Sequence, residues 1–418
     1  MPVIYDKLFN LMETHKITNT VLMRKANISG NIISRLRHNE YVSLETLEKI
    51  CRLFNCQAND ISEFYFPRDK GVRNAEKYFP QIGQIQNRRY LGNKFKLLNF
   101  IEKVVKENCS AVETVADIFS GTGAVASAFD DKMIVTNDLL YSNYICNLAW
   151  FGSASVQLHF LSSLIDDYNR DRIFEENYMT ENFSDTYFSK IDCSKIGFIR
   201  EDIEKKFFAG IITERERAVL IASLIYAMDK IANTCGHYDA WRRGVIFERR
   251  LILPVLNVPI KNNVHNRCFN EDANELVRHI KADLIYIDPP YNSRQYSDTY
   301  HLLENVARWE KPPVYGVALK FDRKSLKSDY CTSKAVNVFE DLIKHCKAKY
   351  ILFSYNNMAQ KGNERSNARI ADEDIFRILN AKGSVKVFSK EYRAFTTGKS
   401  NIRGNEERLF LCKVGKGK

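Results

Sequence analysis

The sequence of 418 residues lacks several features that mark well-defined classes of protein. No apolar run reaches the ~20 residues that a transmembrane helix needs, and no internal repeat or low-complexity tract is present. The ten cysteines are scattered and no signal peptide precedes them, so we expect free thiols in a reducing cytoplasm. Cys235 and His237 lie close together, but no second Cys or His pair completes four zinc ligands. The sequence therefore predicts a globular cytoplasmic protein without membrane contact or a metal site.

Positive charge is what the chain has in excess. Lys and Arg number 62 against 51 Asp and Glu, which gives a formal net charge of +11. A charge of this sign suits a polyanionic partner such as a nucleic acid. The length is sufficient for two or three domains and a sizeable core.

The most informative stretch is Asp288-Pro289-Pro290-Tyr291. It follows the apolar run 283–287, which predicts a buried strand of a parallel sheet. Ligands of open α/β sheets bind outside the carboxyl ends of such strands. Because the prolines lack N–H donors, their segment presents carbonyl oxygens as acceptors; Asp288 adds a charged acceptor, and Tyr291 offers a flat face for stacking. These groups suit a planar ligand that carries an amino substituent, such as a nucleobase.

A glycine-rich turn follows a second strand-like run, residues 112–119, and reads Ser120-Gly121-Thr122-Gly123. Glycines at a strand-to-helix turn allow positive φ and close approach of a ligand to the backbone. The spacing of these glycines, with Ala126, also fits the dinucleotide fingerprint. A nicotinamide-dependent enzyme is therefore an alternative at this point.

Two acids favour another cofactor. Asp117 stands just before the turn, where it suits a cationic or amine-bearing ligand better than a pyrophosphate. Asp138 closes the next short apolar run, where an acid commonly accepts hydrogen bonds from ribose hydroxyls. S-adenosylmethionine, with its ammonium, sulfonium and ribose, matches both positions, whereas the Asp288 tetrad has no part to play in hydride transfer.

Together these motifs resemble the Dam-like adenine-specific DNA methyltransferases, whose signature is D-P-P-Y. The run 88–98, R-R-Y-L-G-N-K-F-K-L-L, resembles the motif with which that family holds the methionine end of the cofactor, and Tyr90 and Lys94 match its aromatic and its lysine. Asp272 resembles the acidic contact to the cofactor adenine. The resemblance covers residues 85–418, in the alpha order of motifs, and implies these cofactor contacts: Tyr90, Gly92, Lys94, Asp117, Phe119, Gly121, Thr122, Gly123, Asp138 and Asp272.

The first 65 residues show helical periodicity and differ from the rest. A helix opens at Ser29, a plausible N-cap residue, and places Ile33 and Leu36 inward. The region resembles the Cro/repressor type of helix-turn-helix domain, with residues 29–37 as its recognition helix. A small helical bundle for packing or dimerisation is the alternative. The side chains expected to contact DNA are Ser29, Asn31, Ser34, Arg35 and Arg37.

We expect a Rossmann-like α/β domain with a mostly parallel sheet, preceded by an all-α helix-turn-helix domain. The predicted boundaries are 1–66 for the helix-turn-helix domain, 67–86 for a linker, 87–150 with 265–418 for the methyltransferase domain, and 151–264 for an inserted target-recognition domain. In the insertion we expect Arg242 and Arg243 to contact phosphates or base edges, although unpartnered surface arginines are the alternative.

The expected function is site-specific methylation of adenine in duplex DNA, as in a restriction–modification system. Asp288, Pro289, Pro290 and Tyr291 would be catalytic, and S-adenosylmethionine would be the cofactor. Expected partners are duplex DNA, a cognate restriction endonuclease and a second copy bound through the helix-turn-helix domain. Alternatives are methylation of the cytosine amino group or of RNA, and a transcriptional regulator with an inactive methyltransferase domain.

Overall fold

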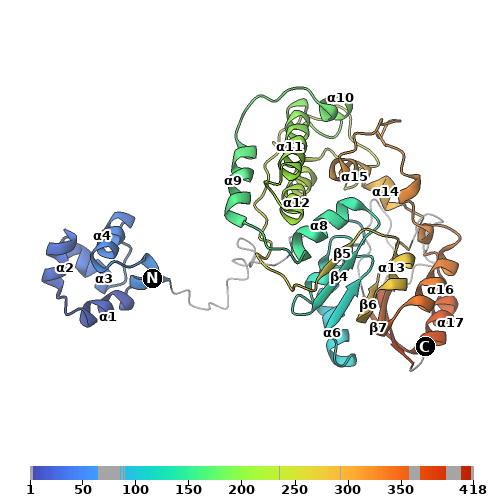
Figure 1. Ribbon diagram of the computed structural model, residues 1–418, viewed down its shortest axis with the longest axis horizontal. Coiled ribbons are helices and arrows are strands. Elements are labelled where there is room, and N and C mark those ends of the chain that lie inside the picture. Colours follow the sequence, from blue (N-terminus) through green and yellow to red (C-terminus); the bar gives the residue numbers. More distant parts are fainter. Residues whose placement is uncertain are drawn as a thin grey trace. The chain divides into compact units, whose positions relative to one another are not determined.

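The computed structural model describes residues 3–64, 85, 88, 90–234, 236–291, 293–356, 368–391 and 406–415. The chain divides into two compact units, Met1–Phe79 and Pro80–Lys418, here called the first and second units (Figure 1). The predicted linker 67–86 lies outside the described residues except for Ile85, and Cys235 lies outside them too.

The first unit is a small helical bundle. Its helices are α1 (Asp6–Thr14), α2 (Asn19–Ala26), α3 (Gly30–Arg37), α4 (Leu44–Phe54) and α5 (Ala58–Ile61). Strand β1 (Val3–Ile4) pairs antiparallel with β2 (Glu63–Phe64) and so joins the two ends of the unit. Its core consists of apolar side chains from every helix, including Leu8, Leu22, Leu36, Ile50 and Ile61.

Helix α3 confirms that the segment predicted as the recognition helix is helical. Ile33 and Leu36 are buried, as expected from their spacing. Ser29 occupies the N-cap position with extended backbone, but its side chain makes no capping hydrogen bond. Ser43 does cap α4, since its Oγ accepts from the Thr46 N–H at 3.2 Å. The exposed side chains of this segment are Ser29, Asn31, Ser34, Arg35 and Arg37.

The second unit is built on a mostly parallel sheet, which confirms the expected fold class. In the described part of the chain the sheet has seven strands in the order β5-β4-β3-β6-β7-β9-β8, and β9 is antiparallel to both neighbours. The strands are β3 (Thr114–Asp117), β4 (Met133–Asn137), β5 (Arg267–Phe269), β6 (Ala282–Ile287), β7 (Ala348–Asn356), β8 (Gly383–Glu391) and β9 (Glu406–Val414).

Apolar side chains cover both faces of the central strands, as is usual for parallel sheets. On β6, Leu284 belongs to one core cluster and Ile285 to the other, because successive side chains point to opposite faces. The first face packs on α6 (Leu98–Asn108), α8 (Tyr141–Phe151) and α15 (His301–Arg308). The second packs on α13 (Ala273–His279), α16 (Ala335–His345) and α17 (Asp372–Lys382) (Figure 1).

The segment predicted as a recognition insertion shares the core of the first face. It contributes α9 (Leu158–Asn169), α10 (Tyr178–Phe183), α11 (Lys190–Phe208) and α12 (Glu214–Ile231). Helix α12 packs on α8, and its Leu220 and Leu224 are fully buried in the cluster that contains Trp150. These helices and the sheet therefore form one compact unit. Among the described residues, no helix is long and apolar enough to cross a membrane.

Candidate active site

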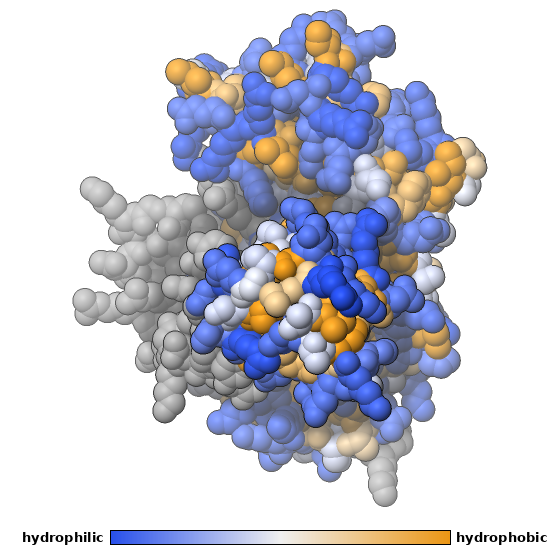
Figure 2. Space-filling model, turned by 90° about the vertical axis from the view of Figure 1, so that its left-hand side faces the viewer, coloured by the Kyte–Doolittle hydropathy of each residue, from blue (hydrophilic) through white to orange (hydrophobic). Residues whose placement is uncertain are grey.

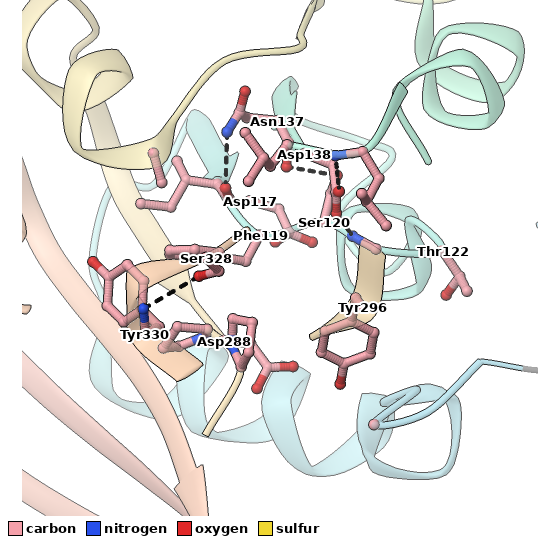
Figure 3. Close-up of a pocket in the computed structure, with 18 of the residues that line it drawn as sticks. Asp117, Phe119, Ser120, Thr122, Asn137, Asp138, Asp288, Tyr296, Ser328 and Tyr330 are labelled. Carbon is pink, nitrogen blue, oxygen red and sulfur yellow. Dashed lines mark hydrogen bonds between the residues drawn. The ribbon is translucent and has the colours of Figure 1, made fainter. Parts of the chain in front are cut away.

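The strand order of the sheet reverses at β3, whose neighbours are β4 and β6. Open α/β sheets bind ligands at such a switch point, beyond the carboxyl ends of the strands. A cleft with an empty volume of about 970 Å³, part of it open to solvent, lies at these ends. Figure 3 shows the side chains around this space, with Asp117 and Asp138 on one side and Asp288 and Tyr296 on the other.

The cleft brings together nearly all the residues that the sequence singled out. Gly123 is the exception among the predicted catalytic and cofactor residues: it does not line the cleft, and Asn147 packs against it. The predicted residues that line the cleft are Tyr90, Gly92, Lys94, Asp117, Phe119, Gly121, Thr122, Asp138, Asp272, Asp288, Pro289, Pro290 and Tyr291.

The glycine loop needs its glycines for two reasons. Gly121 and Gly123 have φ of +51° and +79°, values that residues with a Cβ rarely adopt. A Cβ on Gly123 would also lie 2.4 Å from the Asn147 Oδ1. Asn147 must stay in place because its Nδ2 donates to the Ser120 Oγ at 2.8 Å and to the Gly121 carbonyl at 3.3 Å. The loop is thus held by a side chain packed under Gly123.

Two acids lie beside this loop, Asp117, which is buried, and Asp138, which is partly buried. Asp138 accepts hydrogen bonds from the Gly121 N–H at 2.9 Å and the Leu140 N–H at 2.8 Å. Burial nevertheless raises the pKa of Asp138 to about 6. Asp117 is 1% exposed, and its Oδ1 has no hydrogen-bond partner among the described residues. Burial, with the nearby charges of Asp288 and Asp138, raises the pKa of Asp117 well above its usual range. A buried carboxyl group with an unused acceptor suits a donor supplied by a ligand.

A buried ion-pair network surrounds Asp288. The Lys94 Nζ lies 2.8 Å from the Asp288 Oδ2 and 3.3 Å from the Glu407 Oε1, and it donates to the Gly92 carbonyl at 3.3 Å. The three acceptors match the three ammonium hydrogens of Lys94. The Ser354 Oγ in turn donates to the Glu407 Oε1 at 2.9 Å. Lys94 therefore pairs with Asp288 in this structure. To contact the methionine end of a cofactor, the Lys94 ammonium would have to break one of these three interactions.

The second oxygen of Asp288 is available. Its Oδ1 is buried and has no hydrogen-bond partner within the described part of the chain. Burial raises the pKa of Asp288 to about 6; the Lys94 ammonium opposes this rise, and the Glu407 carboxylate adds to it. The site thus holds one carboxylate oxygen with Lys94 and leaves the other as an acceptor beside Pro289 and Tyr291.

Stacked aromatic rings fix the wall that carries Lys94. The Tyr90 ring is nearly parallel to the rings of Tyr296 and Tyr300, with centroid separations of 5.2 and 4.5 Å, and those two centroids lie 6.2 Å apart. The Tyr300 hydroxyl accepts from the Leu91 N–H at 2.8 Å, and the Tyr296 hydroxyl donates to the Leu91 carbonyl at 3.1 Å. The residues after the D-P-P-Y tetrad therefore position the segment that begins the cofactor motif.

Asp272 does not end a strand, because β5 stops at Phe269. Its carboxylate caps α13 by accepting from the Asn274 N–H at 2.8 Å, and it stays exposed at the edge of the cleft. Arg242 and Arg243 are exposed and lie outside the residues that line the cleft. They directly follow the bridge between Thr234 and Trp241.

Several residues of the cleft region were not predicted from the sequence, and four of them are notable. Glu407, on β9, belongs to the network of Lys94, and no local pattern distinguishes it from any other strand glutamate. Asn137 ends β4, and its side chain bonds to Ile118 and Glu271 in the two neighbouring loops; its position before Asp138 is a strand-end signal that could have found it. The other two are Tyr296 and Tyr330.

A mostly parallel sheet with a glycine loop and acids at its switch point defines a Rossmann-like α/β protein of the nucleotide-binding class, here joined to a helical domain of the helix-turn-helix type. The chain belongs to the D12 class N6 adenine-specific DNA methyltransferase family, whose model matches residues 90–366. A Cro/C1-type HTH DNA-binding domain matches residues 7–67.

Curated relatives are modification enzymes. Modification methylase StsI of Streptococcus sanguinis is 36% identical over 341 residues, which are 76% of this chain and 50% of that protein. Modification methylase LlaI of Lactococcus lactis subsp. lactis is 32% identical over 345 residues, 77% of this chain and 53% of that protein. This chain thus spans about half the length of both. Type II methyltransferase M.NlaIII of Neisseria lactamica is 30% identical, over 76% of this chain and 95% of its own.

Among solved structures, the transcriptional regulator VanUg matches 16% of this chain and 88% of its own, at 32% identity and a TM-score of 0.16.

Proposed function

We propose that this protein transfers a methyl group from S-adenosylmethionine to the exocyclic amino nitrogen of an adenine extruded from duplex DNA. We further propose that it is the modification enzyme of a restriction–modification system, with a cognate endonuclease as its partner, in the cytoplasm. The observation that carries the proposal is the buried Asp288 Oδ1, which has no hydrogen-bond partner among the described residues, in a cleft that Pro289 and Tyr291 also line. An amino group supplies the donor that this acceptor lacks.

The cleft fits the cofactor. The unpartnered Asp117 Oδ1 suits the ammonium of the methionine end. Asp138 keeps spare lone pairs for ribose hydroxyls, and the Gly121 loop allows close approach of the ligand to the backbone. When bound, S-adenosylmethionine supplies an electrophilic methyl group on its sulfonium.

The chain's own residues would activate and orient the nucleophile. Adenine's amino nitrogen reacts poorly because its lone pair is delocalised into the ring. The Asp288 Oδ1 and the Pro289 carbonyl would each accept one amino hydrogen, which draws the nitrogen toward tetrahedral geometry and frees the lone pair. Since Lys94 fixes Oδ2, the direction of Oδ1 is set before the base arrives. The nitrogen loses its proton only after it has become cationic.

Tyr291 would receive the extruded base by stacking. Its ring lies in the cleft and packs edge-on against Tyr355, with centroids 5.9 Å apart and planes at 76°. That support leaves the orientation of the Tyr291 ring defined. Stacking of a base on an aromatic ring contributes about 1–3 kcal/mol.

The buried network predicts opposite pH shifts for two variants. Since the pKa of Asp288 is raised to about 6, kcat/KM should fall as the pH drops through that value and the carboxylate is protonated. Lys94→Met removes the charge that lowers this pKa, so the fall should begin at higher pH. Glu407→Gln removes a charge that raises it, so the fall should begin at lower pH. Rates on DNA from about pH 5 to about pH 9 measure both shifts, and shifts in the same direction would contradict the network.

The function is tested by modification-sensitive long-read sequencing of a methylation-free bacterial host that expresses the protein or its Asp288→Ala form. Methylated adenines at one recurring sequence, absent from the variant, are the expected result. Methylated cytosines would show that the amino group is that of cytosine. An unmodified genome with soluble protein would overturn the proposal in favour of RNA methylation or an inactive regulator.

We propose that the first unit binds duplex DNA through α3 and forms a homodimer to read two half-sites. On α3 the Arg37 guanidinium lies 5.1 Å from the Phe9 ring centroid, and Arg35 pairs loosely with Glu40 at 3.5 Å. Figure 2 shows one face of the molecule, on which hydrophilic side chains predominate and hydrophobic ones form smaller groups.

Footprinting on the DNA upstream of the gene would separate two roles of the first unit. Protection of a site that lacks the methylation target, lost on Asn31→Asp with Ser34→Asp, would show a regulator. The control substitution is Lys25→Asp, an exposed position on α2 outside the predicted contact set. If only methylation sites are protected, α3 assists the enzyme at its target.

A further inference from the structure

A short hairpin stands beside the catalytic cleft. The Tyr315 N–H donates to the Lys320 carbonyl at 2.8 Å, and the Lys320 N–H donates back to the Tyr315 carbonyl at 2.9 Å. The turn closes with a bond from the Leu319 N–H to the Gly316 carbonyl at 3.1 Å, and Gly316 takes a φ of +71°. We call residues 314–321 the rim hairpin.

The base of the rim hairpin packs on the wall of the cleft. Val314 and Phe321 form an apolar cluster with Leu140, Tyr296 and Leu326. The last three side chains all line the cleft. A displacement of the hairpin would therefore disturb the site itself, which places the hairpin at the rim of the pocket that would receive the base.

The tip of the hairpin is held by polar contacts to its backbone. The Trp241 Nε1 donates to the Val317 carbonyl at 3.0 Å. The hydroxyl of the fully buried Tyr187 shares its one hydrogen between the Tyr238 carbonyl at 2.7 Å and the Ala318 carbonyl at 3.0 Å. The Lys320 Nζ lies 2.8 Å from the Asp239 Oδ1. These contacts fix the tip from the segment that leads into Arg242 and Arg243.

The side chains at the tip contrast with this support. Tyr315 is 66% exposed and Val317 is 73% exposed, although both are apolar or aromatic. A rigid support for exposed apolar side chains is typical of a surface prepared for a partner. The exposed Arg242 and Arg243 follow the Trp241 that holds the tip, and the chain as a whole carries +11. Apolar tips flanked by positive charge match a polyanionic partner with an apolar interior.

We propose that the rim hairpin enters the DNA duplex at the target base pair, where Tyr315 and Val317 fill the space that the extruded adenine leaves. Arg242 and Arg243 contact the adjacent phosphates. Proteins that unstack DNA commonly insert apolar side chains between base steps, and extrusion is hardest for a fully paired base. This inference rests on the proposed function, and it adds the residues that would make the base accessible.

The test compares wild type with Tyr315→Ser/Val317→Ser on two duplexes that contain the recurring methylated sequence. In one duplex the target adenine is paired, and in the other it faces a mismatched base. We expect the variant to methylate the paired duplex about 10- to 100-fold more slowly and the mismatched duplex within about threefold of wild type, because a mismatched base is already partly released. The matched control is Phe208→Ser on α11, since Phe208 is 82% exposed.

Three results would overturn the proposed insertion of the rim hairpin into DNA. Unchanged rates on both duplexes would remove the role of the hairpin, and equal losses on both would indicate a general binding or folding effect. A change from dimer to monomer in light scattering, with unchanged rates, would assign the surface to a second copy of the chain. If wild type methylates neither duplex while it binds S-adenosylmethionine, the proposed function itself fails, and the proposal for the rim hairpin fails with it.

Discussion

Asp288→Ala is expected to slow methyl transfer by about a thousandfold, in line with the loss of a preorganised group at a reacting centre, while S-adenosylmethionine still binds. The variant removes the acceptor that would draw one hydrogen from the amino nitrogen. It should fold, because Lys94 keeps the Glu407 Oε1 as a counter-charge at 3.3 Å and the Gly92 carbonyl as an acceptor. The loss of methyl-transfer rate would therefore reflect the chemical step and not a loss of folding.

Single-turnover transfer of a labelled methyl group to DNA measures this loss, and calorimetry measures the affinity for the cofactor. Asp131→Ala is the control, since Asp131 is an exposed aspartate whose neighbour Lys132 is its ion-pair partner. A rate near that of wild type would remove Asp288 from the catalytic role. A parallel loss of cofactor affinity would mean that the carboxylate serves mainly to shape the cleft.

Asp117→Asn is expected to weaken S-adenosylmethionine binding by about 100-fold, as for the loss of a buried charge partner. Burial raises the pKa of Asp117 well above its usual range in the free protein. An ammonium beside it favours the carboxylate and lowers that pKa again. Binding should therefore release a proton, and affinity should rise with pH until Asp117 is ionised in the free protein.

Calorimetry in two buffers of different ionisation enthalpy counts the released protons. In Asp117→Asn the contribution of this group disappears, so any remaining release belongs to the other carboxyl groups of the cleft, Asp138 and Asp288, whose pKa values are both raised to about 6. Asp131→Asn again serves as the exposed control. Proton uptake on binding, or a wild-type affinity for Asp117→Asn, would show that the ammonium lies elsewhere.

The parts of the site that depend on local sequence could be predicted. Asp117, Asp138 and Asp288 each follow a short apolar run, and the carboxyl ends of parallel strands meet at one edge of a sheet. Their convergence around one cleft therefore follows from the strand pattern and from the parallel order. The helix from Ser29 to Arg37 could also be predicted, because its apolar and polar residues recur at helical spacing.

The contacts that depend on register between distant strands could not be predicted. Glu407 reaches Lys94 because β9 runs antiparallel to β7 and places Glu407 opposite Asn356. The sequence of β9 alone shows a strand but not its neighbour or its direction. The packing of Tyr90 against Tyr296 and Tyr300 could not be predicted for the same reason, since it joins segments on either side of the insertion.

The burial of the insertion's helices in the core could not be predicted for a different reason. Arginine is rarely buried without a partner, so the local sequence does not reveal that Arg200, Arg215 and Arg217 are buried. Here the partners come from distant segments. Arg200 donates to the Val306 carbonyl at 2.7 Å, Arg215 to the Pro259 carbonyl at 2.8 Å, and Arg217 pairs with Glu204 at 2.8 Å. Helices α11 and α12 therefore share the core of the second unit with the sheet.

The position of β9 in the sheet determines when the active site can form during translation. A ribosome delivers Lys94 first, Asp288 later and Glu407 last, and β9 must enter between β7 and β8, which have both been synthesised before it. A nascent chain therefore carries the D-P-P-Y tetrad and the glycine loop before the charge network around them can close. We expect modification of DNA to begin only when translation has passed this strand, and a premature stop before Glu407 should leave a product that contains every recognisable motif but cannot assemble the active site.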